Sequence, residues 1–204
     1  SLYTAMNELS NHDHSRFLTR TNRKVGRISS VGSEAASENI NPAVMRTAVA
    51  VQMTWPGSPT VYYGDEAGVC GFTDPDNRRT YPWGRENQEM LAFHRAVISI
   101  HKKYALLRDG SLVFLWNDYQ GLSYGRFSHE EQMIVVLNNL DKERKVEIAV
   151  WKTGISRFGE VPVKRILLSH KYGFTEEEAE YSVYGGSLTV HMLPYSVFVF
   201  YHRN

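Results

Sequence analysis

The stretch from Trp55 to Glu66 reads WPGSPTVYYGDE, and it decides the fold class of the first half of the chain. Its centre, residues 59–63, is short, β-branched and aromatic, and apolar and polar residues do not alternate in it. Such a run is typical of a parallel strand that is buried on both faces. Gly64 ends the predicted strand, so that Asp65 and Glu66 follow its C-terminal end.

Helices are predicted on both sides of this strand. Asn41 and Pro42 suit the cap and the first position of a helix, which Pro56-Gly57 ends. A second helix is expected from about Glu86 to Leu107, with Gly110 as its stop signal. The residues expected on one face of this second helix are Leu91, His94, Val97, Ile98 and His101.

Upstream, residues 2–9 are partly apolar and lead into the polar cluster of residues 10–14, as a strand that feeds a functional loop would. Residues 20–39 are predicted to be a loop with one helical turn. The order strand, helix, strand, helix is typical of an α/β fold. We therefore expect residues 1–108 to be the last quarter of a (β/α)8 barrel, in which function lies at the C-terminal ends of the strands.

After Gly110 the pattern changes to short alternating runs that turn residues separate. Strands are predicted at residues 111–116, 122–127, 132–138, 145–151, 163–168, 187–192 and 197–201. Gly185-Gly186 predicts a tight hairpin. Short strands at this spacing indicate an antiparallel β-sandwich, assigned to residues 109–204.

Composition narrows the function classes. The 204 residues carry a formal net charge of +1, which gives no reason to expect a nucleic acid partner. No apolar run is long enough to span a bilayer, so no membrane partner is expected. The one cysteine, Cys70, excludes an internal disulfide and a cysteine zinc cluster. The first residues do not resemble a signal peptide or a natural start, and the compartment stays open between cytoplasmic and secreted.

The cluster Asn11-His12-Asp13 lies where a barrel places its active site. Asp13 is suited to accept hydrogen bonds from sugar hydroxyls and to stabilise positive charge on a sugar ring. The alternative is a solvated turn in which these side chains only cap the backbone. His12 and His14 flank Asp13, but no further ligand follows at a familiar spacing, and no metal site is predicted.

Two other segments contain polar residues that are candidates for binding or catalysis. One of Asp65 and Glu66, together with Asp13, offers a two-carboxylate glycosidase site as an alternative. The loop of residues 74–83, DPDNRRTYPW, offers an arginine fork for vicinal hydroxyls and Trp83 for stacking on a sugar. A structural alternative is a loop held by Asp–Arg pairs, with Trp83 as an apolar plug.

Three of these motifs, in this order, resemble the α-amylase family of glycoside hydrolases (family 13). Asn11-His12-Asp13 is similar to the family's fourth signature region, at the end of the seventh barrel strand. The stretch WPGSPTVYYGDE resembles its eighth strand. The loop DPDNRR…PW is similar to that of neopullulanases, cyclomaltodextrinases and maltogenic amylases. The resemblance covers the first half by motif and the second half by architecture.

The resemblance implies roles for individual residues. Asp13 matches the third catalytic carboxylate, which stabilises the transition state, and His12 matches its companion at the same subsite. Asp74 and Arg78 match residues that contact a sugar further toward the non-reducing end, and Arg16 is expected to be structural. The family's nucleophile and general acid come from the fourth and fifth barrel strands, which this chain lacks. Neither Asp65 nor Glu66 is then catalytic.

By this resemblance the intact parent is a retaining hydrolase of α-1,4 and some α-1,6 bonds in starch-derived oligosaccharides, and the chain alone is expected to be inactive. A transglycosylase of the same family and a non-catalytic stability or glucan-contact module are the alternatives. The expected partners are α-glucan oligosaccharides, the N-terminal part of the barrel and, through an exposed apolar edge, a second copy of the chain. No cofactor is expected in this chain, because a calcium site would mostly use upstream residues.

Overall fold

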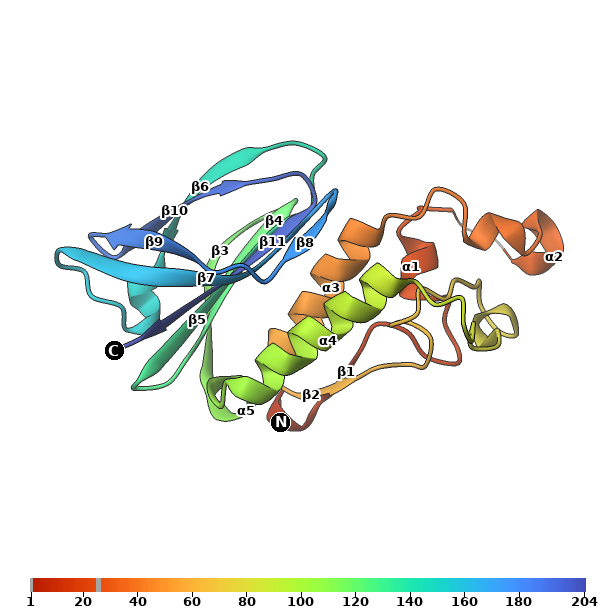
Figure 1. Cartoon of the computed structure of the whole chain (residues 1–204), viewed down its shortest axis with the longest axis horizontal. Coiled ribbons are helices and arrows are strands. Elements are labelled where there is room, and N and C mark those ends of the chain that lie inside the picture. Colours follow the sequence, from red (N-terminus) through yellow and green to blue (C-terminus); the bar gives the residue numbers. More distant parts are fainter. Residues whose placement is uncertain (1, 25–26) are drawn as a thin grey trace. The chain divides into compact units, whose positions relative to one another are not determined.

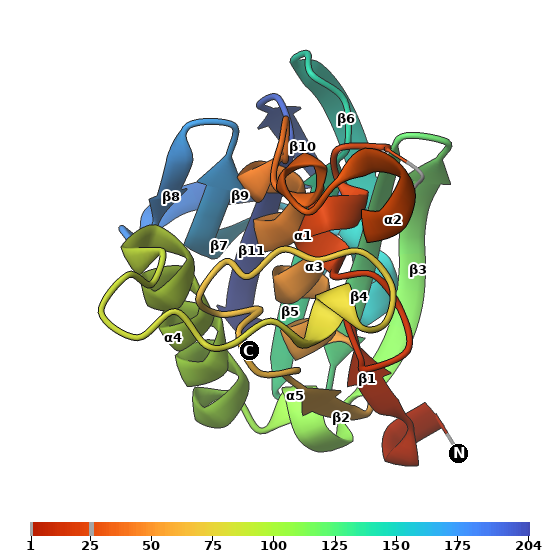
Figure 2. The ribbon, with the colours of Figure 1, turned by 90° about the vertical axis from the view of Figure 1, so that its right-hand side faces the viewer.

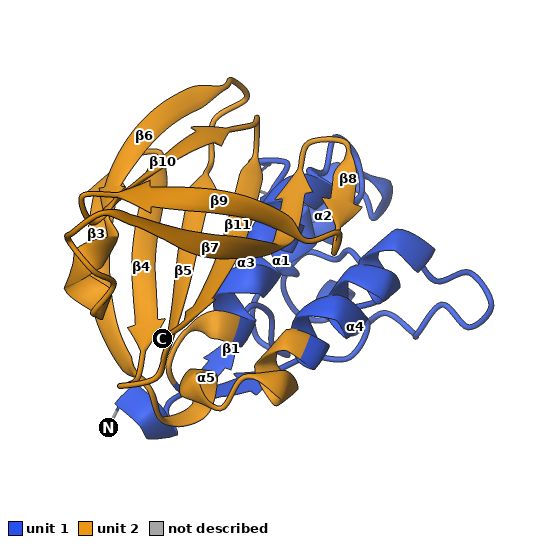
Figure 3. Cartoon of the chain, turned by 60° about the vertical axis from the view of Figure 1, so that its left-hand side comes forward, with its two compact units in different colours: residues 1–53, 57–99 blue, residues 54–56, 100–204 orange. Residues whose placement is uncertain are grey.

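The computed structural model describes residues 2–24 and 27–204, and Figure 1 labels its elements. The chain forms two compact units, which Figure 3 distinguishes by colour. Unit 1 comprises residues 1–53 and 57–99, and unit 2 comprises residues 54–56 and 100–204.

Unit 1 contains a two-stranded parallel sheet, as the sequence predicted. Strand β1 (Met6–Glu8) lies beside β2 (Ser58–Thr60), with Met6 opposite Ser58 and Glu8 opposite Thr60 (Figure 2). The expectation of a strand over residues 59–63 that is buried on both faces is wrong. β2 ends at Thr60, and Val61 and Tyr63 are 36% and 41% exposed. The reason is that β1 is the only strand among the described residues that pairs with β2.

The two long helices begin at asparagine caps. In α3 (Pro42–Thr54), Asn41 Oδ1 accepts hydrogen bonds from the backbone N–H groups of Ala43 and Val44 at 3.1 and 3.2 Å, as predicted. Helix α4 (Gln88–Lys103) begins later than the expected start near Glu86, because Asn87 caps it: Asn87 Oδ1 accepts a hydrogen bond from Met90 N at 2.9 Å.

The single helix expected up to Leu107 is interrupted after Lys103, and α5 (Leu106–Asp109) follows it. Gly110 ends α5 as predicted, and a Cβ there would lie 2.3 Å from Leu106 O. The buried face of α4 is also rotated from the expected one, because Leu91, Ile98 and His101 are partly exposed. Its buried side chains include Met90, Phe93, His94, Val97 and Ile100.

The remaining helical elements of unit 1 are short. They are η1 (Leu2–Thr4), α1 (Phe17–Arg20), α2 (Ile28–Val31), η2 (Glu34–Ala36) and η3 (Asp76–Arg78). The described part of residues 20–39, which leaves out residues 25 and 26, thus has more helical structure than the single turn that we expected. No helix among residues 2–24 and 27–204 has the length and apolar character that crossing a membrane requires.

Unit 2 is built on a nine-stranded sheet whose pairings are all antiparallel. Its strands are β3 (Ser111–Asp118), β4 (Gly121–Phe127), β5 (Glu131–Asn138), β6 (Arg144–Ala149), β7 (Glu160–His170), β8 (Gly173–Thr175), β9 (Ala179–Tyr184), β10 (Ser187–Met192) and β11 (Ser196–Arg203). The order is β3-β4-β5-β11-β7-β9-β10-β6, with β8 beside β7. The sequence analysis missed β8 and β9, where a run of glutamates masks the alternation.

The sheet of unit 2 closes on itself around one core. Its two end strands, β3 and β6, contact each other, and Arg144 on β6 forms an ion pair with Asp118 at the end of β3. Alternate residues of the strands fill the core between the layers. Between β9 and β10, Gly185 and Gly186 have φ angles of 57° and 79°, which confirms the predicted tight hairpin.

Candidate active-site loops

The segment after β1 presents two polar side chains to solvent. Asn11 Oδ1 accepts hydrogen bonds from Asp13 N at 2.9 Å and from His14 N at 3.1 Å. The Asn11 side chain thus binds two backbone donors of the turn, while the side chains of His12 and Asp13 are 65% and 67% exposed. His12 Nε2 lies 3.4 Å from Asp13 Oδ1. The Asp13 carboxylate therefore keeps most of its surface available to a ligand.

The loop that carries Asp74 and Arg78 presents a second polar pair. Arg78 Nε lies 2.6 Å from Asp74 Oδ1, and both side chains are about half exposed, at 51% and 53%. A different pair holds the loop: the buried Asp76 accepts hydrogen bonds from Phe72 N at 2.8 Å and from Arg79 Nε and Nη2 at 3.0 and 2.9 Å. An Asp–Arg pair supports the fold here, while Asp74 and Arg78 remain accessible.

Asn77 joins these two loops, and the sequence analysis missed it. Its side chain is fully buried, and Nδ2 donates to Asn11 O at 3.1 Å and to His14 O at 2.8 Å. The backbone that flanks His12 and Asp13 is thus bonded to the loop of Asp74 and Arg78. No sequence signal separates Asn77 from its polar neighbours, because its partners lie 63 and 66 residues away.

Arg16 lies beneath the same two loops, and its structural role was expected. It is fully buried, and its Nε donates to Asn77 O at 2.8 Å. Its Nη1 donates to Tyr63 O at 2.6 Å and to Asp65 Oδ1 at 3.1 Å. The guanidinium also lies over the Tyr62 ring, 4.1 Å from its centre. Arg16 therefore connects the segment after β2 to the loop of Asn77.

The carboxyl groups of Asp65 and Glu66 accept hydrogen bonds from other residues of the chain. They lie in a turn after Tyr63, where Asp65 N donates to Tyr62 O at 3.1 Å. Burial raises the pKa of the Asp65 carboxyl, although hydrogen bonding from Ser10 and the charge of Arg16 oppose the shift. Glu66 Oε2 accepts a hydrogen bond from Gly64 N at 2.9 Å. This geometry favours structural roles for both carboxyls over the two-carboxylate alternative.

Trp83 is not the apolar plug that the structural alternative required. Its side chain is 81% exposed, and its ring centre lies 4.5 Å from that of Tyr81. An exposed indole on the same loop as Asp74 and Arg78 is suited to contact a sugar face. Among residues 2–24 and 27–204, no group of three or more His, Cys, Asp or Glu side chains is arranged to hold a metal ion.

Comparison with known proteins decides the family. The sequence model described as "Alpha amylase, catalytic domain" matches residues 2–152. The chain belongs to the α-amylase family. It is 33% identical to an amylopullulanase of Thermoanaerobacter thermohydrosulfuricus over 74% of this chain and 11% of that protein. It is 34% identical to neopullulanase 2 of Thermoactinomyces vulgaris over 72% of this chain and 23% of that protein.

Solved structures of α-amylase-family proteins share its fold. The crystal structure of α-amylase from Geobacillus thermoleovorans, complexed with acarbose, superposes on 99% of this chain with a TM-score of 0.76 and 20% identity. The match covers 39% of that protein, so the chain corresponds to a minor part of its relative. The predicted fold class, a portion of a (β/α)8 barrel followed by an antiparallel β-sandwich, is confirmed.

Proposed function

We propose that this chain is the part of a retaining α-glucan hydrolase that supplies the transition-state carboxylate, Asp13. The observation that carries this proposal is the exposed Asp13 carboxylate on a turn directly after a parallel strand, in a chain of the α-amylase family. The parent would cleave α-1,4 and some α-1,6 glucosidic bonds of starch-derived oligosaccharides through a glycosyl-enzyme intermediate.

The proposed role of Asp13 follows from the charge that develops on the sugar during the reaction. As the glycosidic bond breaks, the sugar ring gains positive charge, and a fixed carboxylate stabilises this state more than the ground state. The turn at Asn11 and the bonds from Asn77 hold the Asp13 backbone before substrate arrives. His12, beside Asp13, would donate a hydrogen bond to a hydroxyl of the same sugar. Asp74 and Arg78 would bind the hydroxyls of a sugar nearer the non-reducing end.

This chain alone is proposed to be inactive, because in the family the nucleophile and the general acid come from barrel strands that it lacks. The first test is incubation of the purified 204-residue chain with maltoheptaose, with reducing ends followed over time. We expect no increase. Hydrolysis that Glu66→Gln abolishes would contradict this expectation and support the two-carboxylate alternative.

The role of Asp13 is tested in an enzyme that contains this chain together with the other barrel strands. Asp13→Asn keeps the size of the side chain and removes its charge, so turnover should fall by at least about 100-fold. The melting temperature should change little, since the side chain is exposed. Asp141→Asn is the matched control, because Asp141 is an exposed aspartate on unit 2 that pairs with Lys171. Wild-type turnover in Asp13→Asn would refute the role.

Two alternatives make different products in the same assay. A transglycosylase would form oligosaccharides longer than maltoheptaose, because a sugar hydroxyl would compete with water for the intermediate. A non-catalytic module would bind the glucan while the complete protein released no reducing ends.

A further inference from the structure

We infer that unit 2 carries a second sugar-binding site, a pocket at one end of its sheet that takes a short α-glucan. The pocket has a volume of about 660 Å³, within the roughly 300–1,000 Å³ usual for small-molecule sites. It is bordered by the hairpin between β4 and β5, by η4 (Val150–Thr153) and by Asn204. All of its lining residues belong to unit 2. The identity of the sugar rests on the proposed function.

Gln132 is the first observation that points to a ligand. Its side chain borders the pocket at the start of β5 and is 1% exposed. Its Oε1 atom is buried and has no hydrogen-bond partner among the described residues. A buried amide oxygen without a partner costs free energy, and a hydroxyl group of a bound sugar would satisfy it.

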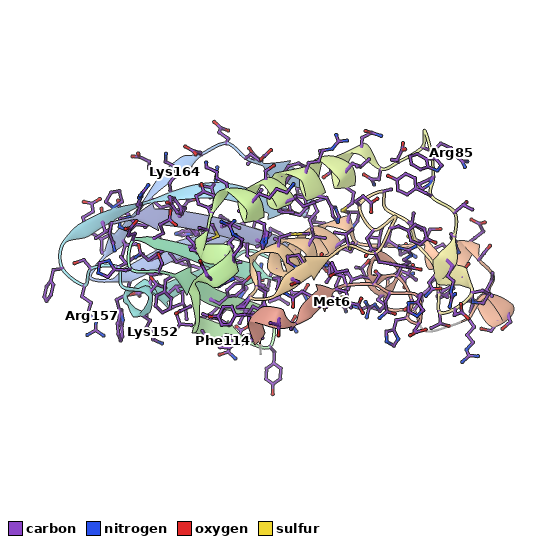
Figure 4. The ribbon with its side chains drawn as sticks, turned by 90° about the horizontal axis from the view of Figure 1, so that it is seen from below. Met6, Arg85, Phe114, Lys152, Arg157 and Lys164 are labelled. Atoms are coloured by element: carbon purple, nitrogen blue, oxygen red, sulfur yellow. The ribbon has the colours of Figure 1, made fainter. Side chains whose placement is uncertain are left out.

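Trp151 is the second observation. It borders the same pocket, and its side chain is 38% exposed. The Arg157 guanidinium lies over one face of the indole, 3.3 Å from the ring centre, but Arg157 does not border the pocket. Figure 4 shows the side chains of Arg157 and Lys152 at the same end of unit 2. The Arg157 cation thus holds one face of the Trp151 indole. The remaining exposed surface of the ring is suited to stack on a sugar.

The polar groups around the pocket fit a neutral hydroxylated ligand. Ser111, Ser128, His129, Lys152 and Asn204 supply donors and acceptors around the rim, and no Asp or Glu side chain of the described residues borders the pocket. Asn204 is bonded to the β4–β5 hairpin, where its N donates to Glu130 O and its Nδ2 to His129 O, both at 2.9 Å. A few placed polar groups beside an aromatic ring are the usual composition of a sugar site. One lysine and one histidine also suit a small anion, which the test includes.

The test uses the indole N–H signals of the four tryptophans in ¹⁵N NMR spectra of the 204-residue chain, each assigned by a single Trp→Phe variant. Titration with maltotriose should shift the Trp151 signal saturably, with a Kd of millimolar order. Gln132→Leu should weaken this binding by about three- to tenfold. In Trp151→Ala, read at the backbone amide of Gly154, saturable binding should be lost.

Trp83→Ala is the matched control, because it removes an exposed indole from unit 1 and should leave the Trp151 shift unchanged. The Trp83 signal reports separately on the loop of Asp74 and Arg78, so failure of the proposed function and failure of this site are distinguishable. Absence of a saturable Trp151 shift would overturn the inference. An equal shift with cellotriose or with inorganic phosphate would also overturn it, since the pocket would then not select α-linked glucose. Binding that survives both Gln132→Leu and Trp151→Ala would place the sugar elsewhere.

Discussion

At the scale of single residues, the polar side chains of unit 1 divide into two groups. Arg16, Asn77 and His94 are buried at 0%, 0% and 2% exposure, while His12 and Asp13 face solvent. Buried polar groups fix the backbone, because each unmade hydrogen bond there would cost free energy. The exposed ones are free to meet a substrate. Within unit 1, burial therefore separates structural from candidate functional residues more sharply than residue type does.

His94 should make the stability of the chain depend on pH. Its Nδ1 lies 2.9 Å from Met90 O, and its Nε2 is buried with no partner among residues 2–24 and 27–204. Burial lowers its pKa below the ordinary value of 6.5. As the pH falls through 6.5, the unfolded chain binds a proton that the folded chain resists, so the free energy of unfolding decreases. One such group contributes at most about 1.4 kcal/mol per pH unit.

Urea unfolding between pH 7.5 and pH 5 measures this effect. His94→Leu should flatten the slope below pH 6.5, because no buried imidazole then resists protonation. Gln88→Leu, at an exposed position in the first turn of the same helix, replaces a side chain that does not titrate and should keep the wild-type slope. Identical slopes in the wild type and His94→Leu would show that this imidazole does not set the dependence.

At the scale of elements, hydrogen bonds between distant segments hold the candidate loops together. Asn77, on η3, is bonded to the segment after β1, and Arg16 is bonded to both η3 and the segment after β2. These segments contain little regular secondary structure, so side-chain bonds replace the ladders that strands and helices would supply.

Asn77→Asp should loosen this arrangement. The change replaces a donor with an acceptor that faces the carbonyl oxygens of Asn11 and His14. We expect the free energy of unfolding to drop by about 2 kcal/mol or more, and amide hydrogen exchange at Asp13 and His14 to accelerate. The exposed Asn139→Asp, which is the same chemical change in unit 2, should alter neither. Unchanged exchange in Asn77→Asp would contradict the role of this side chain.

A single arginine organises the start of the sheet in unit 2. Arg126 on β4 is fully buried, and its Nη1 donates to Thr54 O at 2.9 Å. Its Nη2 donates to Leu106 O at 3.1 Å and to Gly110 O at 2.9 Å, so it also binds the carbonyls of the first residue of α5 and of the residue that follows the helix. A planar fork reaches several carbonyl groups at once.

Arg126→Lys should therefore be strongly destabilising despite the retained charge. One ammonium group cannot reach the carbonyls of Thr54, Leu106 and Gly110 together, and the loss should be about 2–3 kcal/mol in denaturant unfolding. Arg108→Lys, at an exposed position of α5, should change stability by less than about 0.5 kcal/mol. Equal losses in the two variants would mean that the fork geometry of Arg126 is unimportant.

At the scale of the whole molecule, the two units differ in how completely they bury their sheets. The sheet of unit 2 closes around its own core, whereas the sheet of unit 1 has two strands. A two-stranded sheet is only marginally stable alone, and its open edges offer unpaired backbone groups to another chain. Met6 on β1 is 62% exposed and adds apolar surface at this edge.

We expect the isolated chain to associate through this edge. Light scattering after size exclusion should give a mass above 23.4 kDa that rises with concentration. Met6→Lys places a charge on the edge strand and should reduce the association. Tyr119→Lys, at a fully exposed position between β3 and β4, should leave it unchanged. A monomer at every concentration would show that the edge of unit 1 is not an interface.

The sequence by itself determined the type and order of most elements. Local rules govern the Asn41 cap, the end of α5 at Gly110 and the Gly185-Gly186 hairpin, and all three were confirmed. The family was also readable from three short motifs, because all three occur in the family's order along the chain. Sequence patterns predicted a feature correctly where the residues that form it lie within about one turn of each other along the chain.

Only the tertiary structure decided which polar residues are buried. Asn77 and Arg16 bind partners 47 to 66 residues away, and no local pattern encodes such bonds. The exposure of Tyr63 and the burial of Asp65 likewise depend on which segments pack beside β2, and propensity predicted a longer, buried strand there. The same reason applies to the Gln132 amide oxygen, which has no partner in the described part of the chain, since burial is a property of the packed chain and not of a residue's neighbours in sequence.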